Sequence, residues 1–476
     1  NANSVVNLTD EFSFNVANNY QTNLPLSFSL LIQSGTSTWT SMIFENVKSA
    51  DLDMVSMTVA NTSGVVAIGS PSNIHFTIKN NGSIPVNNVN VLLKSKSLFL
   101  QVIDSLGTLG SISNGQTANN QGDPFTVQAL TGIYPGVKLK AELKFYNNTG
   151  YEETEEILIQ VGQIATTDPV PPDEYGYVIY DDTDTGYDDA PTYNWDEISS
   201  TGTALTLDDT GENNDKVILI DLPFPFIMYG ETYTQATVCS NGWLSLGATE
   251  QANFRNMPLP GPLAPRPMIA PYWNDLKKSG ANSGVYTYYN EQDHNFVIQW
   301  NNMVTLSDNQ ANTFQIILYD PVHFATPLGD GPIKFQYKVF HPGSQGSVTA
   351  PNNFITCGIQ DHTALRGLTY TYNNQYMPGA AQLHSEMALY FTHPFFLNEA
   401  PYIVSNAPIL HDANGNNVVE SGEIVNIGLP LSNVGLTTAT NLHVTLMTAN
   451  PYITFINPTA SYLHLIPSGN STNTDY

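Results

Sequence analysis

The chain has 476 residues, of which 41% are hydrophobic and 12% charged, and its 15 Lys and Arg against 42 Asp and Glu give a formal net charge of −27. This balance disfavours nucleic acid and anionic lipid as partners, and the absence of any run of 18 apolar residues predicts no membrane span. The 25 Tyr, 21 Phe, 34 Gly and 30 Pro residues favour strands and turns over helices.

Residues 1–49 are predicted to be the C-terminal half of an immunoglobulin-like β-sandwich. Their apolar residues alternate with polar ones, which is the period of a half-buried strand. The pattern also aligns at a constant offset with a later part of the chain. The aligned pairs are Phe12/Phe125, Phe14/Val127, Leu26/Leu139, Phe28/Ala141, Leu30/Leu143 and Ile32/Phe145.

Residues 50–164 are predicted to form a complete immunoglobulin-like sandwich of about seven short strands. A second constant-offset alignment relates its residues 76–93 to residues 429–446. The identities in this alignment are Asn80/Asn433, Gly82/Gly435, Asn88/Asn441, Val91/Val444 and Leu93/Leu446. Alternating strands also align by chance, but the shared Asn-x-Gly turn favours repetition.

Residues 165–178 contain the proline-rich, acidic stretch "TTDPVPPDEYGY" and are predicted to be a linker. Residues 179–397 are predicted to form a larger β-sandwich, because no helical period persists over ten residues and Gly, Asn and Pro turns separate apolar runs. The predicted strands include residues 216–222, 232–238, 284–289, 295–300, 313–319, 333–339 and 353–360.

Two motifs in this larger domain are interpreted as structural. In "SNGWLSLG", Asn241 and Gly242 form a turn that returns Trp243 to a sheet. In "APYWNDL", Trp273 and its tyrosine neighbour would supply core area, and Asp275 would cap or coordinate. An exposed aromatic pair that binds sugar is the alternative, but the flanking apolar residues need a partner face, which favours the core.

The order of "LPFPFIMYGETYTQATVCSNGWLSLG", "MIAPYWNDL", "TFQIILYD", "IKFQYKVF" and "CGIQD" resembles that of nidogen-like extracellular β domains. It resembles more closely the non-catalytic β region beside the catalytic domain of gingipain-like and subtilisin-like secreted bacterial peptidases. The flanking sandwiches resemble the CARDB-like, adhesion-type immunoglobulin domains of such proteins. The resemblance implies an extracellular, cell-surface architecture and no particular activity.

The sequence contains no motif for a serine-hydrolase elbow, a zinc peptidase or a phosphate-binding loop, and no enzyme is predicted. Cys239 and Cys357 are the only cysteines and lie in apolar runs, either as one disulfide or as two buried thiols. The stretch "YDDTDTGYDDAP", residues 180–191, is interpreted first as a solvated loop, then as a weak cation site, and last as a pair of catalytic carboxylates.

Residues 398–476 are predicted to be the N-terminal half of another immunoglobulin-like sandwich, and they carry the one specific ligand pattern. Calcium prefers six to eight oxygen ligands, which a loop can supply at positions 1, 3, 5, 7, 9 and 12. Counted from Asp412 in "DANGNNVVESGE", these positions are Asp412, Asn414, Asn416, the Val418 carbonyl, Glu420 and Glu423. Asn417 replaces the usual Gly, which weakens the pattern without excluding it. The alternative is an Asn- and Gly-rich hairpin without an ion.

Half a sandwich exposes a sheet face and unpaired edges, so each half-domain needs a complement. The expected partners are neighbouring copies or further domains of the same protein, and a surface glycan is a further candidate. We expect a structural or adhesive segment of a bacterial cell-surface protein, such as a building block of a filament, stalk or surface layer assembled head-to-tail. The alternatives are the accessory region of a secreted peptidase and a carbohydrate-binding module.

Overall fold

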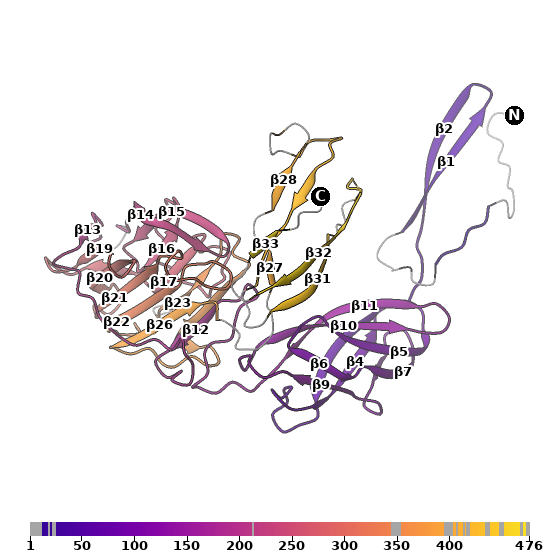
Figure 1. Cartoon of the computed structure of the whole chain (residues 1–476), viewed down its shortest axis with the longest axis horizontal. Coiled ribbons are helices and arrows are strands. Elements are labelled where there is room, and N and C mark those ends of the chain that lie inside the picture. The colour runs from indigo at the N-terminus through magenta and orange to yellow at the C-terminus, as the bar shows by residue number, and fades with distance from the viewer. Residues whose placement is uncertain are drawn as a thin grey trace. The chain divides into compact units, whose positions relative to one another are not determined.

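The computed structural model describes residues 12–17, 20, 25–211, 214–343, 354–394, 403–405, 408–412, 415, 419–433, 438–446, 452–466 and 470–472. Every regular element among them is a β-strand, which confirms the predicted all-β class. The chain divides into two compact units, Asn1–Gln163 and Ile164–Tyr476, which we describe separately (Figure 1). None of the described residues belongs to a helix long and apolar enough to cross a membrane.

The first unit contains a hairpin and a sandwich. The hairpin strands are β1 (Leu26–Ser34) and β2 (Ser37–Glu45), which form a two-stranded sheet. The sandwich strands are β3 (Leu52–Val59), β4 (Ser72–Asn80), β5 (Val86–Ser95), β6 (Leu100–Asp104), β7 (Leu106–Ile112), β8 (Thr117–Asn119), β9 (Phe125–Ala129), β10 (Lys138–Tyr146) and β11 (Glu152–Gln160). One sheet has the order β11-β10-β5-β7, and the other has the order β3-β4-β9-β6 with β8 paired to β4. Alternate side chains of both sheets, such as Phe76 and Phe145, are buried in the core.

The central part of the second unit, which we call the central module, spans β12 to β26. Its strands are β12 (Val178–Asp181), β13 (Thr203–Ala204), β14 (Val217–Met228), β15 (Glu231–Cys239), β16 (Trp243–Leu246), β17 (Met268–Trp273), β18 (Leu276–Lys278), β19 (Gly284–Asn290), β20 (Asn295–Thr305), β21 (Ala311–Tyr319), β22 (Ile333–Val339), β23 (Thr356–Gln360), β24 (Gly367–Tyr372), β25 (Gln375–Tyr376) and β26 (Met387–Thr392). One sheet has the order β12-β26-β22-β21-β20-β19-β13, with β18 paired to β20, and the other has the order β14-β15-β16-β17-β23-β24-β25. All seven strands predicted in this region are present.

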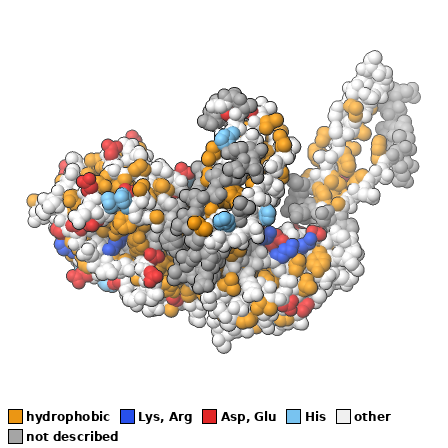
Figure 2. Space-filling model, in the orientation of Figure 1, with side chains coloured by type: hydrophobic (Ala, Val, Ile, Leu, Met, Phe, Trp, Pro, Cys, Tyr) orange, Lys and Arg blue, Asp and Glu red, His pale blue; other side chains and the backbone are white. Residues whose placement is uncertain are grey.

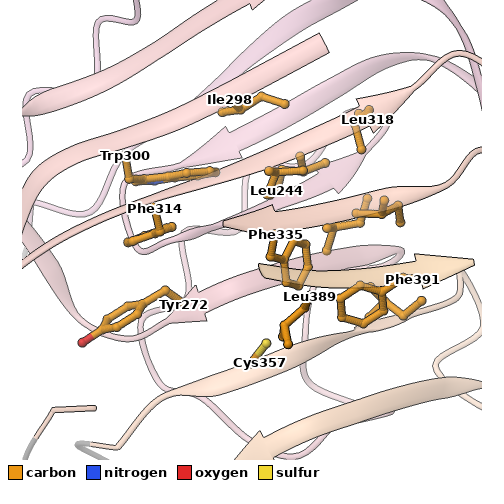
Figure 3. Close-up of a cluster of buried hydrophobic side chains, with 14 of the residues drawn as sticks. Leu244, Tyr272, Ile298, Trp300, Phe314, Leu318, Phe335, Cys357, Leu389 and Phe391 are labelled. Atoms are coloured by element: carbon orange, nitrogen blue, oxygen red, sulfur yellow. The ribbon is translucent and has the colours of Figure 1, made fainter. Parts of the chain in front are cut away.

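The two sheets of the central module share a large aromatic and aliphatic core (Figure 3). Three rings from different strands stack in sequence at its centre. The centroid of Phe314 lies 5.3 Å from that of Trp300 and 5.1 Å from that of Tyr272. Val170 and Tyr177, which belong to the segment predicted as a linker, are also buried in this core.

A row of buried glutamines fastens residues 194–198 to the outer face of the larger sheet. Gln299, Gln315 and Gln336 lie opposite one another on β20, β21 and β22, and all three are fully buried. The Gln336 side chain exchanges two hydrogen bonds with the Asn194 backbone, of 2.7 and 2.8 Å. The Gln315 amide donates to the Asp196 carbonyl and to Gln299. Each side-chain amide of the row has hydrogen-bond partners on both sides. The row therefore holds the polar segment of residues 194–198, which we call the strap, against this face of the sheet, where an apolar cover would otherwise be needed.

The last part of the second unit contains short strands. They are β27 (Ile403–Ser405), β28 (Ile409–His411), β29 (Asn426–Gly428), β30 (Pro430–Asn433), β31 (Ala439–Thr445), β32 (Thr459–Leu465) and β33 (Asn470–Thr472). They pair as three small sheets, β27-β30-β33, β28-β29 and β31-β32. Leu431, Ala439, Tyr462 and Leu465 form a small buried cluster.

The pairings of β30 with β33 and of β31 with β32 repeat those of the sandwich in the first unit at an offset of 353 residues, the separation of Asn80 from Asn433, whereas the pairings of β27 and β28 are shifted by two residues. Leu431 pairs with Ser471 as Ile78 pairs with Ala118, and Ala439 pairs with Leu465 as Val86 pairs with Ile112.

A side-chain hydrogen bond repeats as well. Asn433 donates from Nδ2 to the Leu465 carbonyl at 2.7 Å, and Asn80 donates to the Ile112 carbonyl at 3.1 Å. The strand pairing therefore agrees with the alignment made from the sequence.

Candidate functional site

The two motifs of the central module form one interlocked structure. The Tyr272 amide donates to the Gly242 carbonyl at 3.2 Å, and the Leu276 amide donates to Oδ1 of Asn241 at 3.0 Å. Gly242 has a φ of 74°, and a Cβ at this position would lie 2.0 Å from the Tyr272 carbonyl oxygen. The turn predicted at residues 241–242 is therefore confirmed, and only glycine fits it.

Trp243 and Trp273 are both fully buried, which confirms the interpretation of these residues as core. Each indole N–H donates to the carbonyl of Asn253, at 2.9 Å from Trp243 and 2.8 Å from Trp273. Both side chains lie in a smaller cluster with Cys239 and Met268, separate from the main core. Leu244 and Tyr272, their neighbours in sequence, belong to the main core. Adjacent residues of β16 and β17 therefore point to opposite faces of the sheet, and each face packs into a different core.

The buried tryptophans cannot form a sugar-binding platform, but a second aromatic pair is partly exposed. The rings of Tyr193 and Trp195 stack with centroids 6.4 Å apart and an interplanar angle of 29°. The Trp195 indole donates to Glu197 at 3.1 Å, and the Lys338 ammonium lies 5.5 Å from the Trp195 ring centroid. Hydrogen bonding to Lys338 and Gln299 helps to hold the pKa of Glu197 below its usual value despite the cost of desolvation. The sequence analysis missed this pair, whose only local signal is the "TYNWDE" stretch.

The interpretation of residues 180–191 as a solvated loop is wrong for two of its carboxylates. Asp181 is 1% exposed, and its Oδ2 accepts from the Tyr370 hydroxyl at 2.7 Å and from the Ala381 amide at 2.8 Å. Its Oδ1 accepts from the amide and hydroxyl of Thr183. The donors on Oδ2 come from far along the chain, so the local polarity of the sequence could not reveal the burial.

Asp184 is completely buried beside Asp181 and is the most strongly perturbed carboxyl of this stretch. Its Oδ2 accepts from the Asp181 amide at 2.8 Å, whereas its Oδ1 has no hydrogen-bond partner among the described residues. Desolvation raises the pKa of Asp184 to about 7, and the neighbouring Asp181, Asp168 and Asp182 carboxylates add to the rise. Because a substrate could not reach a completely buried carboxyl, the geometry favours a structural role over acid–base catalysis.

Cys239 and Cys357 are buried free thiols in β15 and β23. Burial raises the pKa of Cys357 to about 12 and that of Cys239 well above its usual value. The Tyr337 hydroxyl lies 3.2 Å from the Cys357 sulfur. A nucleophilic cysteine needs an exposed, readily ionised thiol, so neither residue fits that role.

The predicted calcium loop lies between the paired strands β28 and β29. Asp412, Glu420 and Glu423 are described, whereas Asn414, Asn416 and Val418 lie outside the described residues. Oε2 of Glu423 accepts from the Glu420 amide at 3.3 Å. In the part of the chain that the structure describes, no group of three or more His, Cys, Asp or Glu residues is arranged to hold a metal. The calcium site therefore stays a prediction.

Comparison with known protein families relates part of the central module to a described family. Residues 187–388 match the family described as NIDO related. The matched range contains both interlocked motifs and most strands of the central module, and it supports the prediction of a nidogen-like domain. Such a domain is consistent with a non-catalytic, extracellular role. No curated protein matches the chain.

Proposed function

We propose that this chain is a non-catalytic structural or adhesive segment of a bacterial cell-surface protein, located outside the cell. The proposal rests on one observation: the motif residues of the NIDO-related region are buried and have a structural role. Gly242, Trp243 and Trp273 fix a buried joint and present no reactive group to solvent. In this role the central module serves as a rigid body that displays surfaces, and the flanking immunoglobulin-like parts connect it to its neighbours.

Calcium binding at the loop of residues 412–423 is a second part of the proposal. Asp412, Glu420 and Glu423 supply carboxylates, and Asn414, Asn416 and the Val418 carbonyl would complete the ligand set. An ion there would stiffen the β28–β29 hairpin, and the extracellular space supplies calcium in abundance. The corresponding loop of the complete sandwich lacks these acids, so the fold itself does not need the ion.

Head-to-tail assembly is the third part. The hairpin of the first unit and the small sheets after the central module correspond to complementary parts of one sandwich. Joining them between copies would build a filament, stalk or layer without a separate connector.

Two measurements test the proposal. Antibodies against the central module should label intact cells of the source organism as strongly as permeabilised cells, and light scattering should give masses above that of a single chain at high concentration. Labelling that requires permeabilisation would overturn the extracellular location. A monomer at every concentration would overturn head-to-tail assembly. Proteolytic activity of the native protein would favour the alternative, the accessory region of a secreted peptidase.

Carbohydrate binding is a second candidate, and the stacked Tyr193–Trp195 pair favours it. Partly exposed, stacked rings next to an anchored carboxylate offer both an apolar surface and hydrogen-bond acceptors to a sugar. Trp195→Ala should abolish glycan binding, whereas Trp39→Ala in the hairpin should leave it unchanged. If glycans bind neither protein nor variants, this candidate is wrong.

A further inference from the structure

The N-terminal residues of the first unit, both before and within the hairpin, expose apolar side chains whose counterparts in the complete sandwich are buried. Phe12 is 86% exposed where Phe125 is fully buried, and Ile32 is 45% exposed where Phe145 is fully buried. Phe28 of β1 lies opposite Ile43 of β2, and the equivalent Ala141 of β10 lies opposite Ile157 of β11, so the two antiparallel pairs differ by one residue in the second strand. In this alignment β1 is equivalent to β10, but its apolar side chains lack the cover that the sandwich gives to β10.

The sheet of β31 and β32 shows the reciprocal feature. In the complete sandwich β5 is paired on both sides, with β7 on one edge and β10 on the other. Its counterpart β31 pairs with β32 alone among the described strands. Leu446, the residue directly after this strand, is 41% exposed, whereas the equivalent Leu93 is 1% exposed. The edge of β31 that corresponds to the β10 side of β5 thus has the strand order and the apolar surface to receive a copy of β10.

Charge does not oppose such a contact. Residues 12–44 and residues 424–474 contain no Asp, Glu, Lys or Arg, in a chain whose net charge is −27. In contrast, β10 and β11 of the complete sandwich carry ion pairs such as Lys144–Glu152. Figure 2 shows hydrophobic side chains along the hairpin. Two strongly acidic copies would repel each other elsewhere, so these uncharged segments are the surfaces on which they can meet.

We propose that β1 of one copy pairs antiparallel with β31 of a second copy, in the register in which β10 pairs with β5. This inference rests on the head-to-tail assembly proposed above and names its strands. The known register places Leu143 opposite Leu93 and Phe145 opposite Val91. Transferred by the two alignments, it gives the pairs Leu30/Leu446, Leu31/Thr445, Ile32/Val444 and Gln33/His443. Leu30 and Ile32 then face the core with Leu446 and Val444, while Leu31 and Gln33 stay on the outer face.

Cross-linking between variants that each carry one added cysteine tests this register. We would prepare Leu31→Cys, Gln33→Cys, His443→Cys and Thr445→Cys separately and mix them in pairs at high concentration with copper phenanthroline as the oxidant. All four positions are exposed, and both native thiols are buried. The matched mixtures, 33 with 443 and 31 with 445, should give about tenfold more disulfide-linked dimer than the crossed mixtures, because disulfides tolerate little displacement of their Cα atoms.

A matched pair of surface variants provides the control. Leu30→Glu, added to the Gln33→Cys chain, should abolish the dimer because the carboxylate would enter the core. Ser29→Glu should not, because Glu142 occupies the equivalent position in β10.

Each contrary result has a distinct meaning. Equal cross-linking in matched and crossed mixtures, with oligomers in light scattering, would overturn the register and leave the assembly standing. Absence of dimer in every mixture, with a monomeric mass, would overturn both. A chain carrying Gln33→Cys and His443→Cys together that cross-links within a monomer would show that its own C-terminal strands are the occupant, which also overturns the proposal. Surface labelling of cells tests the extracellular role independently of all three.

Discussion

Trp243 and Trp273 donate their indole N–H groups to one acceptor, the carbonyl oxygen of Asn253. The two residues come from different motifs and from neighbouring strands, β16 and β17. The shared acceptor holds residues 252–257 over the outer face of the seven-stranded sheet, where Ala252 and Met257 pack against the smaller core. The two motifs therefore specify one joint of the fold.

Replacing the glycine at this joint should be severely destabilising. In Gly242→Ala, the new Cβ would collide with the Tyr272 carbonyl and the residue would remain at positive φ. We expect the free energy of unfolding to fall by on the order of 3 kcal/mol or more, measured by urea denaturation. Gly247→Ala is the control. Gly247 has a similar φ of 82°, but a Cβ added there would lie 4.0 Å from its nearest neighbour, a ring atom of Tyr233. Equal losses in both variants would contradict the role of the close approach.

Removing the central glutamine of the buried row should loosen the strap. Gln315→Leu leaves the Asp196 carbonyl and the Gln299 side chain without their amide donor. The expected loss of stability is about 1–3 kcal/mol, with faster hydrogen exchange confined to residues 192–198. Gln235→Leu, an exposed glutamine hydrogen-bonded to Asp221, should change neither by a comparable amount. Unchanged exchange in residues 192–198 would show that the Gln315 amide is not needed to hold this segment on the sheet.

Asp184 should make stability depend on pH. Its pKa is raised from 3.8 to about 7 on folding, so the folded state keeps a proton that the unfolded state loses as the pH rises. The stabilisation is complete below pH 3.8 and disappears as the pH rises through about 7. Compared with Asp184→Asn, the native protein should lose on the order of 1–3 kcal/mol across this window, measured by denaturation at several pH values. Asp188→Asn, at an exposed position, should give a curve parallel to that of the native protein. A parallel curve for Asp184→Asn would refute the assignment.

Calcium should bind the loop of residues 412–423 with a dissociation constant on the order of 10⁻⁴–10⁻³ M, as in other extracellular modules. Titration calorimetry measures the affinity, and a chelator should lower the unfolding temperature. Glu423→Gln should weaken binding at least tenfold, since it removes the acid at the last ligand position. Asp104→Asn, which changes an acid in another part of the chain, controls for charge alone. No heat of binding in the native protein would mean that the loop is a hairpin without an ion.

The sequence predicted the features that depend on local residues. The turn at Gly242 and the burial of Trp243 followed from a short motif, since an Asn-Gly pair and its flanking apolar residues have few alternative conformations. The alignment of Asn80 with Asn433 likewise matched two residues whose side chains donate to equivalent carbonyls in the structure.

The features that the sequence concealed depend on tertiary contacts. Asp181 is buried because Tyr370 and Ala381 supply donors, and their approach cannot be inferred from residues 180–191. The glutamine row is recognisable only when the register of β20, β21 and β22 is known.

The pairing of β12 with β26 determines how the central module would respond to tension. Val178, near the start of the module, lies opposite Thr392, near its end. The backbone therefore arrives and departs at neighbouring points of one sheet edge. A pull along the chain would first load the segment from Val170 to Tyr177, whose two end residues are buried in the core, and the hydrogen bonds of the β12–β26 ladder would then separate one after another from the Val178 end. The other strands would lie beside the line of force, so the chain would lengthen at this point while the rest of the central module stays folded.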